Sequence, residues 1–92
     1  MRLIGRDRLR DLQSSDEQVK KWLLNWVAEV INAQWKHPSD VVSQFPNIRK
    51  GSDGHFIFPI GNCNWAVCLL IAFPQGIALI TDLEAKDGIH GN

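Results

Sequence analysis

The hydrophobic period of this chain changes halfway along it, and that change constrains the fold more than any other feature. Between residues 16 and 33 large apolar side chains recur at spacings of three and four, which predicts one buried face of a helix. From residue 55 to 60 the apolar positions alternate instead, as in a strand with one buried face. Helices first and strands after predict an α+β fold, with N-terminal helices packed on a sheet. The helical stripe comprises Val19, Trp22, Leu23, Trp26, Val27, Val30 and Ile31.

Shorter signals place the remaining elements. Residues 2–4 predict a short strand, and residues 6–12 a short helix with Leu9 and Leu12 facing inward. Residues 65–73 are apolar at every position, which is typical of a central strand covered on both faces by its own chain or by a partner. A turn at 74–76 then leads into a strand at 77–81, so the second half predicts an antiparallel meander.

Two helix starts carry capping signals. Ser14 and Glu17 have the spacing of a capping box, and Ser39 precedes a predicted helix at residues 40–44. Pro38 disfavours helix in the residue before it, so the long helix is expected to end before this point.

The length of 92 residues predicts a single domain over residues 1–92, with a flexible tail at 87–92. No apolar run is long enough to span a membrane, and the charged N-terminus has no apolar signal core, so we expect a cytoplasmic protein. Cys63 and Cys68 are too few for a disulfide framework or a zinc site. No phosphate loop or HExxH pair is present, and no two histidines share ligand spacing, so we expect no metal and no cofactor.

Charge is unevenly divided between the two halves. Residues 1–50 hold nine of the ten basic residues and six acidic ones, a net charge of +3, and residues 51–92 have a net charge of −3. A nucleic-acid-binding patch would therefore have to come from the N-terminal half. An ordinary solvated surface is the alternative interpretation.

The order of several segments resembles a known family. Residues 33–40 read AQWKHPSD, and Val41, Val42, Phe45 and Pro46 follow them. Together with the tryptophan-bearing helix before them and the aromatic-then-aliphatic run at 65–73, this order resembles the HigB-type toxins of type II toxin–antitoxin modules, in the RelE-like superfamily. The resemblance covers roughly residues 2–80.

The resemblance implies a compact RelE-like domain with N-terminal helices on a twisted antiparallel sheet. It also implies a ribosome-dependent mRNA endoribonuclease that inhibits translation, with a HigA-type helix-turn-helix antitoxin, the ribosome and mRNA as partners. Cleavage by the ribose 2′-hydroxyl needs a general base, a general acid and cations near the phosphate. Neither a membrane nor a cofactor is implied.

Candidate site residues follow from this chemistry. Glu84, Lys86 and His90 are the catalytic candidates, because they can exchange protons near the C-terminal end. The basic candidates would hold RNA by charge, and Trp65 would stack on a base, although core packing is the alternative for a tryptophan. The predicted RNA- and ribosome-binding residues are Arg6, Arg10, Lys36, Arg49, Lys50, Asn62 and Trp65.

The chain departs from the family pattern at the positions that carry the chemistry. The family's arginine after the central aromatic falls on Ala66, and its last-strand basic residue on Thr81. Its C-terminal histidine falls near Lys86 and its tyrosine near Ile89. Two alternatives therefore stay open: an active ribonuclease, or a catalytically inactive HigB-like protein that acts by binding an antitoxin or another partner.

Overall fold

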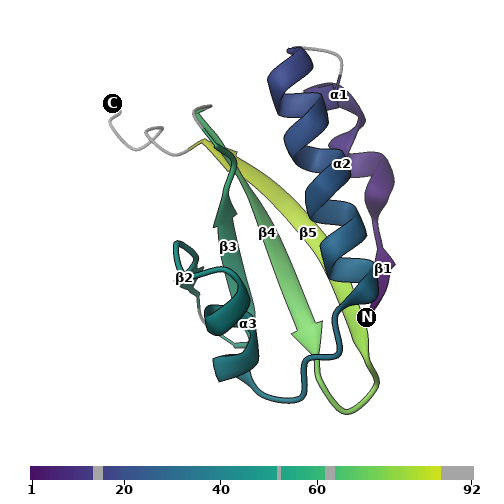
Figure 1. The fold of residues 1–92 in the computed structure, drawn as a ribbon, viewed down its shortest axis with the longest axis vertical. Helices are drawn as coiled ribbons and strands as arrows, with labels where there is room; N and C mark the ends of the chain where they lie inside the picture. Colours follow the sequence, from purple (N-terminus) through teal and green to yellow (C-terminus); the bar gives the residue numbers. More distant parts are fainter. Residues whose placement is uncertain (14–15, 52, 62–63, 86–92) are drawn as a thin grey trace.

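The computed structural model describes residues 1–13, 16–51, 53–61 and 64–85 of the chain. The five strands form one sheet in the order β1-β5-β4-β3-β2, and the predicted α+β class is confirmed (Figure 1). In chain order the elements are β1 (Arg2–Ile4), the 3-10 turn η1 (Arg6–Leu9), α1 (Arg10–Gln13), α2 (Glu17–Asn32), α3 (Pro38–Gln44), β2 (Arg49–Lys50), β3 (His55–Pro59), β4 (Trp65–Ala72) and β5 (Ile77–Ala85).

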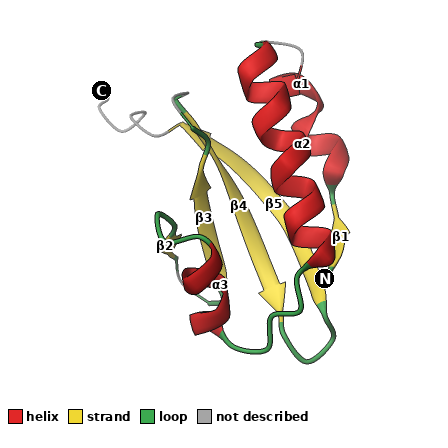
Figure 2. Ribbon diagram, in the orientation of Figure 1, coloured by secondary structure: helices red, strands yellow, loops and turns green. Residues whose placement is uncertain are grey.

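The helices lie on one face of the sheet. Figure 2 shows α2 and α3 in front of the strands, and the core joins helix residues to the residues of β3, β4 and β5 that face them. Trp26 of α2 meets Phe58 of β3 edge to face at 5.4 Å between ring centroids, and Phe45 meets Phe58 at 5.2 Å. No described helix covers the opposite face, which we call the helix-free face.

Helix α2 forms as the apolar stripe predicts. Val19, Leu23, Trp26, Val27 and Val30 are buried, because the 3.6-residue period places them on one side. Trp22 is half-buried at the margin of the stripe, and Ile31 lies outside it, exposed to solvent.

The predicted cap of α2 is wrong. Asp16 is the N-cap, and its carboxylate accepts a hydrogen bond from the Gln18 amide at 2.7 Å. A carboxylate two residues before that amide satisfies an end donor directly, so the helix starts at Glu17 rather than from a cap at Ser14. Ser14 itself is not among the described residues.

The start of α3 differs from the prediction in the same way. His37 is the N-cap and Pro38 is the first helical residue, where its missing amide hydrogen costs nothing. The Asp40 carboxylate turns back and accepts from the amides of Lys36 at 2.9 Å and His37 at 3.1 Å. Asp40 therefore secures this helix start, not Ser39.

The predicted meander from β3 to β5 is confirmed. Phe56, Phe58 and Ile60 are buried on the helix side, and β4 lies centrally between β3 and β5. Strand β5 extends to Ala85, four residues beyond its predicted end. The periodicity did not predict the two edge strands of the sheet. Strand β1 pairs in parallel with β5, and the two-residue β2 pairs with β3.

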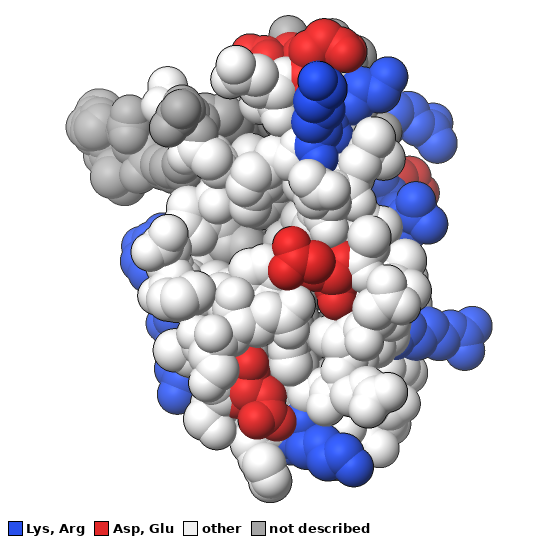
Figure 3. Space-filling model, in the orientation of Figure 1, with Lys and Arg blue, Asp and Glu red and all other residues white. Residues whose placement is uncertain are grey.

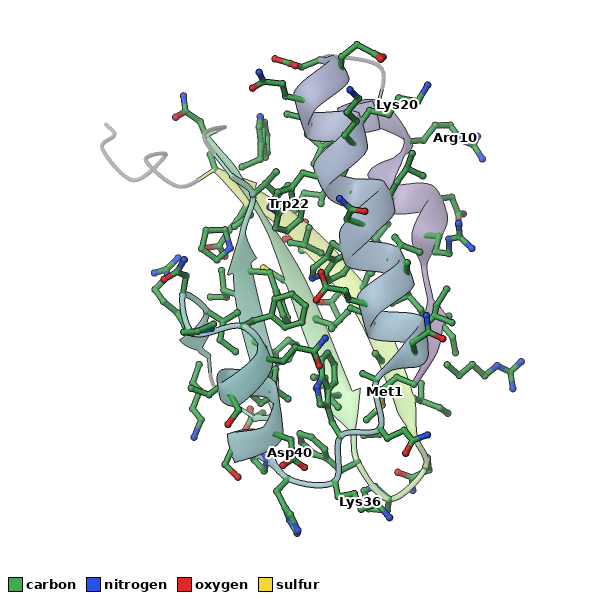
Figure 4. The ribbon with its side chains drawn as sticks, viewed as in Figure 1. Met1, Arg10, Lys20, Trp22, Lys36 and Asp40 are labelled. Atoms are coloured by element: carbon green, nitrogen blue, oxygen red, sulfur yellow. The ribbon has the colours of Figure 1, made fainter. Side chains whose placement is uncertain are left out.

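The N-terminal amino group ties the first strand to the long helix. It donates to the carbonyl of Ile31 at 3.1 Å and to that of Ala33 at 2.6 Å, and Figure 4 shows Met1 beside this end of α2. A positive charge at the C-terminal end of a helix is favoured by the helix dipole. None of the helices described has the length and apolar content needed to cross a membrane.

Candidate functional site

Side chains with acid–base chemistry collect on the helix-free face. Successive strand residues point to opposite faces, so residues between those that face α2 point away from it. By this alternation His55 of β3, Cys68 of β4, and Asp82 and Glu84 of β5 share the helix-free face, and the register places Cys68 opposite Asp82. They line a hollow of about 410 Å³, completed by Gly51, Ile57 and Thr81.

An ion pair crosses the sheet beside this hollow. Arg49 of β2 reaches over β3 and β4, and its Nη2 lies 3.5 Å from Oε1 of Glu84 in β5. Both side chains are partly in solvent, with exposed fractions of 63% and 43%, so the pair contributes little to stability. The ion pair matters for the site because it holds a guanidinium next to a carboxylate on the helix-free face.

Glu84 also interacts with the only described cysteine. The Cys68 thiol donates to Oε2 of Glu84 at 3.5 Å, and the pKa of that thiol is raised to about 11. Burial is the main cause, followed by the negative charge of Glu84. Cys68 therefore stays protonated near neutral pH and is a hydrogen-bond donor rather than a nucleophile.

An irregularity in β5 shapes the same face. The register slips between Cys68 and Leu69, so that Thr81 is an extra residue between Ile80 and Asp82. The Thr81 hydroxyl donates to the carbonyl of Cys68 at 3.3 Å and so holds the bulge against β4. A bulge of this kind re-aims the residues that follow, here Asp82 and Glu84.

Of the predicted site residues that the structure describes, it brings Arg49 and Glu84 together. Lys50 pairs with Phe56, so it belongs to the other face of the sheet, and Trp65 alternates with Ala66 onto the helix side. The remaining predicted residues lie elsewhere.

Arg6 and Arg10 are on η1 and α1 beside β1, at the sheet edge opposite β2. Lys36 lies at the end of the molecule far from the last residues of β5 (Figure 4). Asn62, Lys86 and His90 fall outside the described residues, so their predicted roles stay predictions.

Sequence reasoning missed His55 and Asp82. The spacing of the histidines argues only against a metal site, and a proton-transfer site needs no such spacing. The signal that could have found His55 is the alternation of side chains along a strand. His55 is one residue before the buried Phe56, so its side chain lies on the face opposite the core.

A second, separate cleft of about 380 Å³ lies on the helix side between α2, the end of α3 and β3. Its lining includes the rings of Trp22, Trp26, Phe45 and Phe58, and Glu29 is its charged residue. The described residues that line it include neither a cation nor a proton-transfer pair, whereas the hollow has an imidazole, two carboxylates and an adjacent guanidinium. Among the described residues no cluster of three or more His, Cys, Asp and Glu side chains is arranged to hold a metal ion.

Comparison with known families agrees with the fold and its order of elements. The family model HigB_toxin, a RelE-like toxic component of a toxin–antitoxin system, matches residues 19–85, from α2 to the end of β5. No curated protein matches the chain significantly. The matched span includes all the residues that line the hollow, as well as Arg49. This chain therefore belongs to the HigB toxin family and has its RelE-like fold.

Proposed function

We propose that this protein is the toxin of its module and acts in the cytoplasm as a ribosome-dependent mRNA endoribonuclease that inhibits translation. The observation that carries the proposal concerns Ala66, where the family resemblance places an arginine. Ala66 is the direct register partner of Glu84, and the Arg49 guanidinium lies 3.5 Å from that same Glu84. Arg49 thus supplies from β2 the cation that Ala66 lacks.

The hollow contains the groups that cleavage by a 2′-hydroxyl requires. Glu84, a partly exposed carboxylate, takes the proton of the attacking hydroxyl as the oxygen–phosphorus bond forms. His55 in its protonated form gives a proton to the departing 5′-oxygen as the second bond breaks. Arg49 balances the negative charge that builds up on the phosphate oxygens. Stabilisation of such developing charge is usually the largest single contribution to catalysis.

The sequence candidates beyond the hollow complete the proposal. Lys86 follows Glu84 by two residues and His90 by six, and we assign them to the same mRNA-contacting end of the chain as further proton-transfer or phosphate-binding groups. Lys50 lies beside Arg49 at the β2 edge and holds ribosomal RNA by charge. The partner that restrains the toxin is a HigA-type helix-turn-helix antitoxin.

A second candidate function rests on the charge of the hollow. Asp82 and Glu84 give it two carboxylates against one adjacent guanidinium, and Cys68 keeps its proton. Carboxylates in excess repel a phosphate backbone. This favours the alternative in which the fold persists without catalysis and the protein acts by binding an antitoxin or another partner.

One experiment separates the two candidates. The wild-type chain and Glu84→Gln are expressed from an inducible promoter, and growth and transcript 5′ ends are recorded with and without a drug that blocks ribosome initiation. A ribonuclease gives growth arrest and new 5′ ends that need active translation, and Glu84→Gln loses both. Normal growth with intact transcripts, from protein shown by circular dichroism to be folded, supports the binding function and rules out the ribonuclease.

A further inference from the structure

The cleft between α2, the end of α3 and β3 contains binding groups that the proposed ribonuclease does not use. Its volume of about 380 Å³ is in the range of small-molecule sites, which combine apolar walls with a few polar groups. The α2 residues that line it are three or four positions apart and so share one side of the helix. They are Trp22, Asn25, Trp26 and Glu29.

A half-buried indole is held in a fixed orientation at this cleft. Trp22 lies nearly parallel to Trp26, with 6.2 Å between ring centroids and 13° between the planes. At the end of β3 the backbone approaches the edge of the same indole, because a Cβ added to Gly61 would lie 3.5 Å from Cδ1 of Trp22. The part of the Trp22 ring that is exposed can therefore stack on a planar ligand.

A chain of hydrogen bonds orients the carboxylate of the cleft. The Trp35 indole N–H donates to Oε1 of Gln44 at 3.0 Å, so the amide nitrogen of Gln44 faces Glu29 and donates to its Oε1 at 3.2 Å. Among the described residues Glu29 pairs with no cation, and its Oε2 accepts no hydrogen bond. Glu29 thus offers a positioned acceptor to the N–H groups of a ligand.

The lining of the cleft also includes a donor that has no partner. Trp26 is 1% exposed, and its Nε1–H donates to no acceptor among the described residues. Burial of an unsatisfied N–H is unfavourable, so such a group in a folded protein needs an explanation. A ligand that brings an acceptor beside Trp26 would supply the missing partner.

The charge of this face restricts the ligand. Figure 3 shows Lys and Arg side chains around the margins of the face, whereas its middle carries acidic side chains only. Glu29 would repel a phosphate, and no cation lines the cleft within the described part of the chain. An organic cation would pair with Glu29, but it would leave the Trp26 N–H without an acceptor. An uncharged planar ligand with both donors and acceptors fits better.

We propose that this cleft binds the guanine ring of an uncharged ligand, either guanine itself or guanosine. Guanine has two adjacent N–H donors, at N1 and at its 2-amino group, and one carboxylate can accept both. Its O6 and N7 are acceptors that can meet the Trp26 N–H, and its rings can stack on Trp22. Adenine and cytosine have an acceptor nitrogen beside their amino group, which Glu29 would repel.

The test measures binding of guanosine and guanine to the full-length protein by isothermal titration calorimetry. Inosine, which lacks the 2-amino group, is expected to bind more than about tenfold more weakly than guanosine, because a hydrogen bond to a charged group is lost. Glu29→Gln should weaken guanosine binding to a similar extent. The matched control is Glu17→Gln, since Glu17 is an exposed glutamate of the same helix outside the cleft, and it should bind like the wild type.

Nuclear magnetic resonance supplies a second readout. On addition of guanosine the indole N–H signal of Trp26 should move downfield as it gains an acceptor, and that of Trp65, which does not line the cleft, should stay in place. The spectrum of free Glu29→Gln also shows whether this variant is folded. A higher affinity for guanosine than for guanine would place the ribose inside the cleft, and equal affinities would place it outside.

Four results would overturn the proposal. They are the absence of binding by both guanine and guanosine, equal affinity for adenosine, unchanged guanosine affinity in folded Glu29→Gln, and tighter binding of the organic cation agmatine than of guanosine.

The cleft and the hollow can be tested separately, because they share no lining residue. Glu29→Gln is therefore expected to leave mRNA cleavage at the wild-type level. If the wild-type protein binds guanosine but cuts no mRNA, only the ribonuclease proposal fails. If it cuts mRNA but binds no guanine compound, only the guanine proposal fails.

Discussion

Glu84 is the residue on which the candidate site depends, because it joins side chains from two other strands. It accepts from the Cys68 thiol on β4 and pairs with Arg49 on β2. Both partners are distant in the sequence, because Cys68 lies 16 residues before Glu84 and Arg49 lies farther back still. The chemistry at this point therefore arises from the strand order and register rather than from a local motif.

The raised pKa of Cys68 gives a prediction for its reactivity. In a Cys63→Ser background, ultraviolet titration of the thiolate should give a midpoint of about 11 in the folded protein, against an ordinary value of 9.0. A raised folded-state pKa stabilises the protein fully below the unfolded value, and this contribution is lost as pH rises from 9.0 toward 11. Glu84→Gln should lower the midpoint, since it removes a negative charge. An ordinary midpoint in both proteins would contradict the contact.

A substitution at Gly5 tests how closely the N-terminal segment approaches β5. Its φ is +92°, and a Cβ added there would lie 2.9 Å from the Ile80 carbonyl oxygen. Gly5→Ala should therefore lower the free energy of unfolding by more than about 1–3 kcal/mol, the usual cost of a left-handed non-glycine residue. Urea unfolding measures the change.

Gly76→Ala is the matched control for this prediction. Gly76 also has a positive φ, +69°, but an added Cβ meets nothing within 4 Å. It should show the conformational cost without the clash. Equal losses in the two variants would mean that β1 and η1 are not held against Ile80 as described.

At the scale of elements, α3 gives a pH-dependent prediction. The pKa of Asp40 is lowered because its carboxylate accepts from the amides of Lys36 and His37. A lowered folded-state pKa stabilises the protein above the ordinary value of 3.8, and this stabilisation is lost as pH falls through the folded value. Asp40→Asn should therefore lower the Tm at pH 7 and make little difference at pH 2.

Ser39→Ala is the control for α3. Ser39 is the cap that the sequence predicts, but in the structure it is exposed and His37 is the N-cap. Its Tm should match that of the wild type at both pH values. A larger loss for Ser39→Ala than for Asp40→Asn at neutral pH would restore the cap that the sequence suggested.

Elements with strong periodicity could be predicted from the sequence, and those defined by pairing could not. The stripe from Val19 to Val30 determines α2, and Phe56 and Phe58 determine the inward face of β3. The two residues of β2 have no period of their own, so they become a strand only because β3 offers hydrogen bonds at Ile57 and Phe56. The parallel pairing of β1 with β5 likewise joins residues more than seventy positions apart.

The candidate site was predictable only in part for the same reason. Glu84 and Arg49 were named from residue type and family resemblance, but their proximity depends on a side chain that spans two strands. His55 and Asp82 became candidate site residues only because the fold places both of them in the lining of the hollow. The slip in register at Thr81 has no sequence signature here, and it decides where Asp82 and Glu84 point.

At the scale of the whole molecule, the fold separates two surfaces. The hollow lies on the helix-free face, whereas α2 and α3 lie on the other face of the sheet. The uneven charge of the sequence follows this division, because most cations are on the N-terminal elements and the acidic residues of β5 line the hollow. The proposed catalysis would thus use the helix-free face of the sheet, with Arg49 as its cation.

Arg49 is proposed to take the place of the family arginine that falls on Ala66, and the most direct test is the rate of mRNA cleavage on purified ribosomes by wild type, Arg49→Ala and Lys50→Ala. Removing a group that stabilises developing charge usually costs about 10²–10³ in rate. At saturating ribosome concentration Arg49→Ala should show a loss of that size, whereas Lys50→Ala, its neighbour on the other face, should weaken ribosome binding but cut at near the wild-type rate once the ribosome is saturating. Equal rates in all three folded proteins would contradict the account.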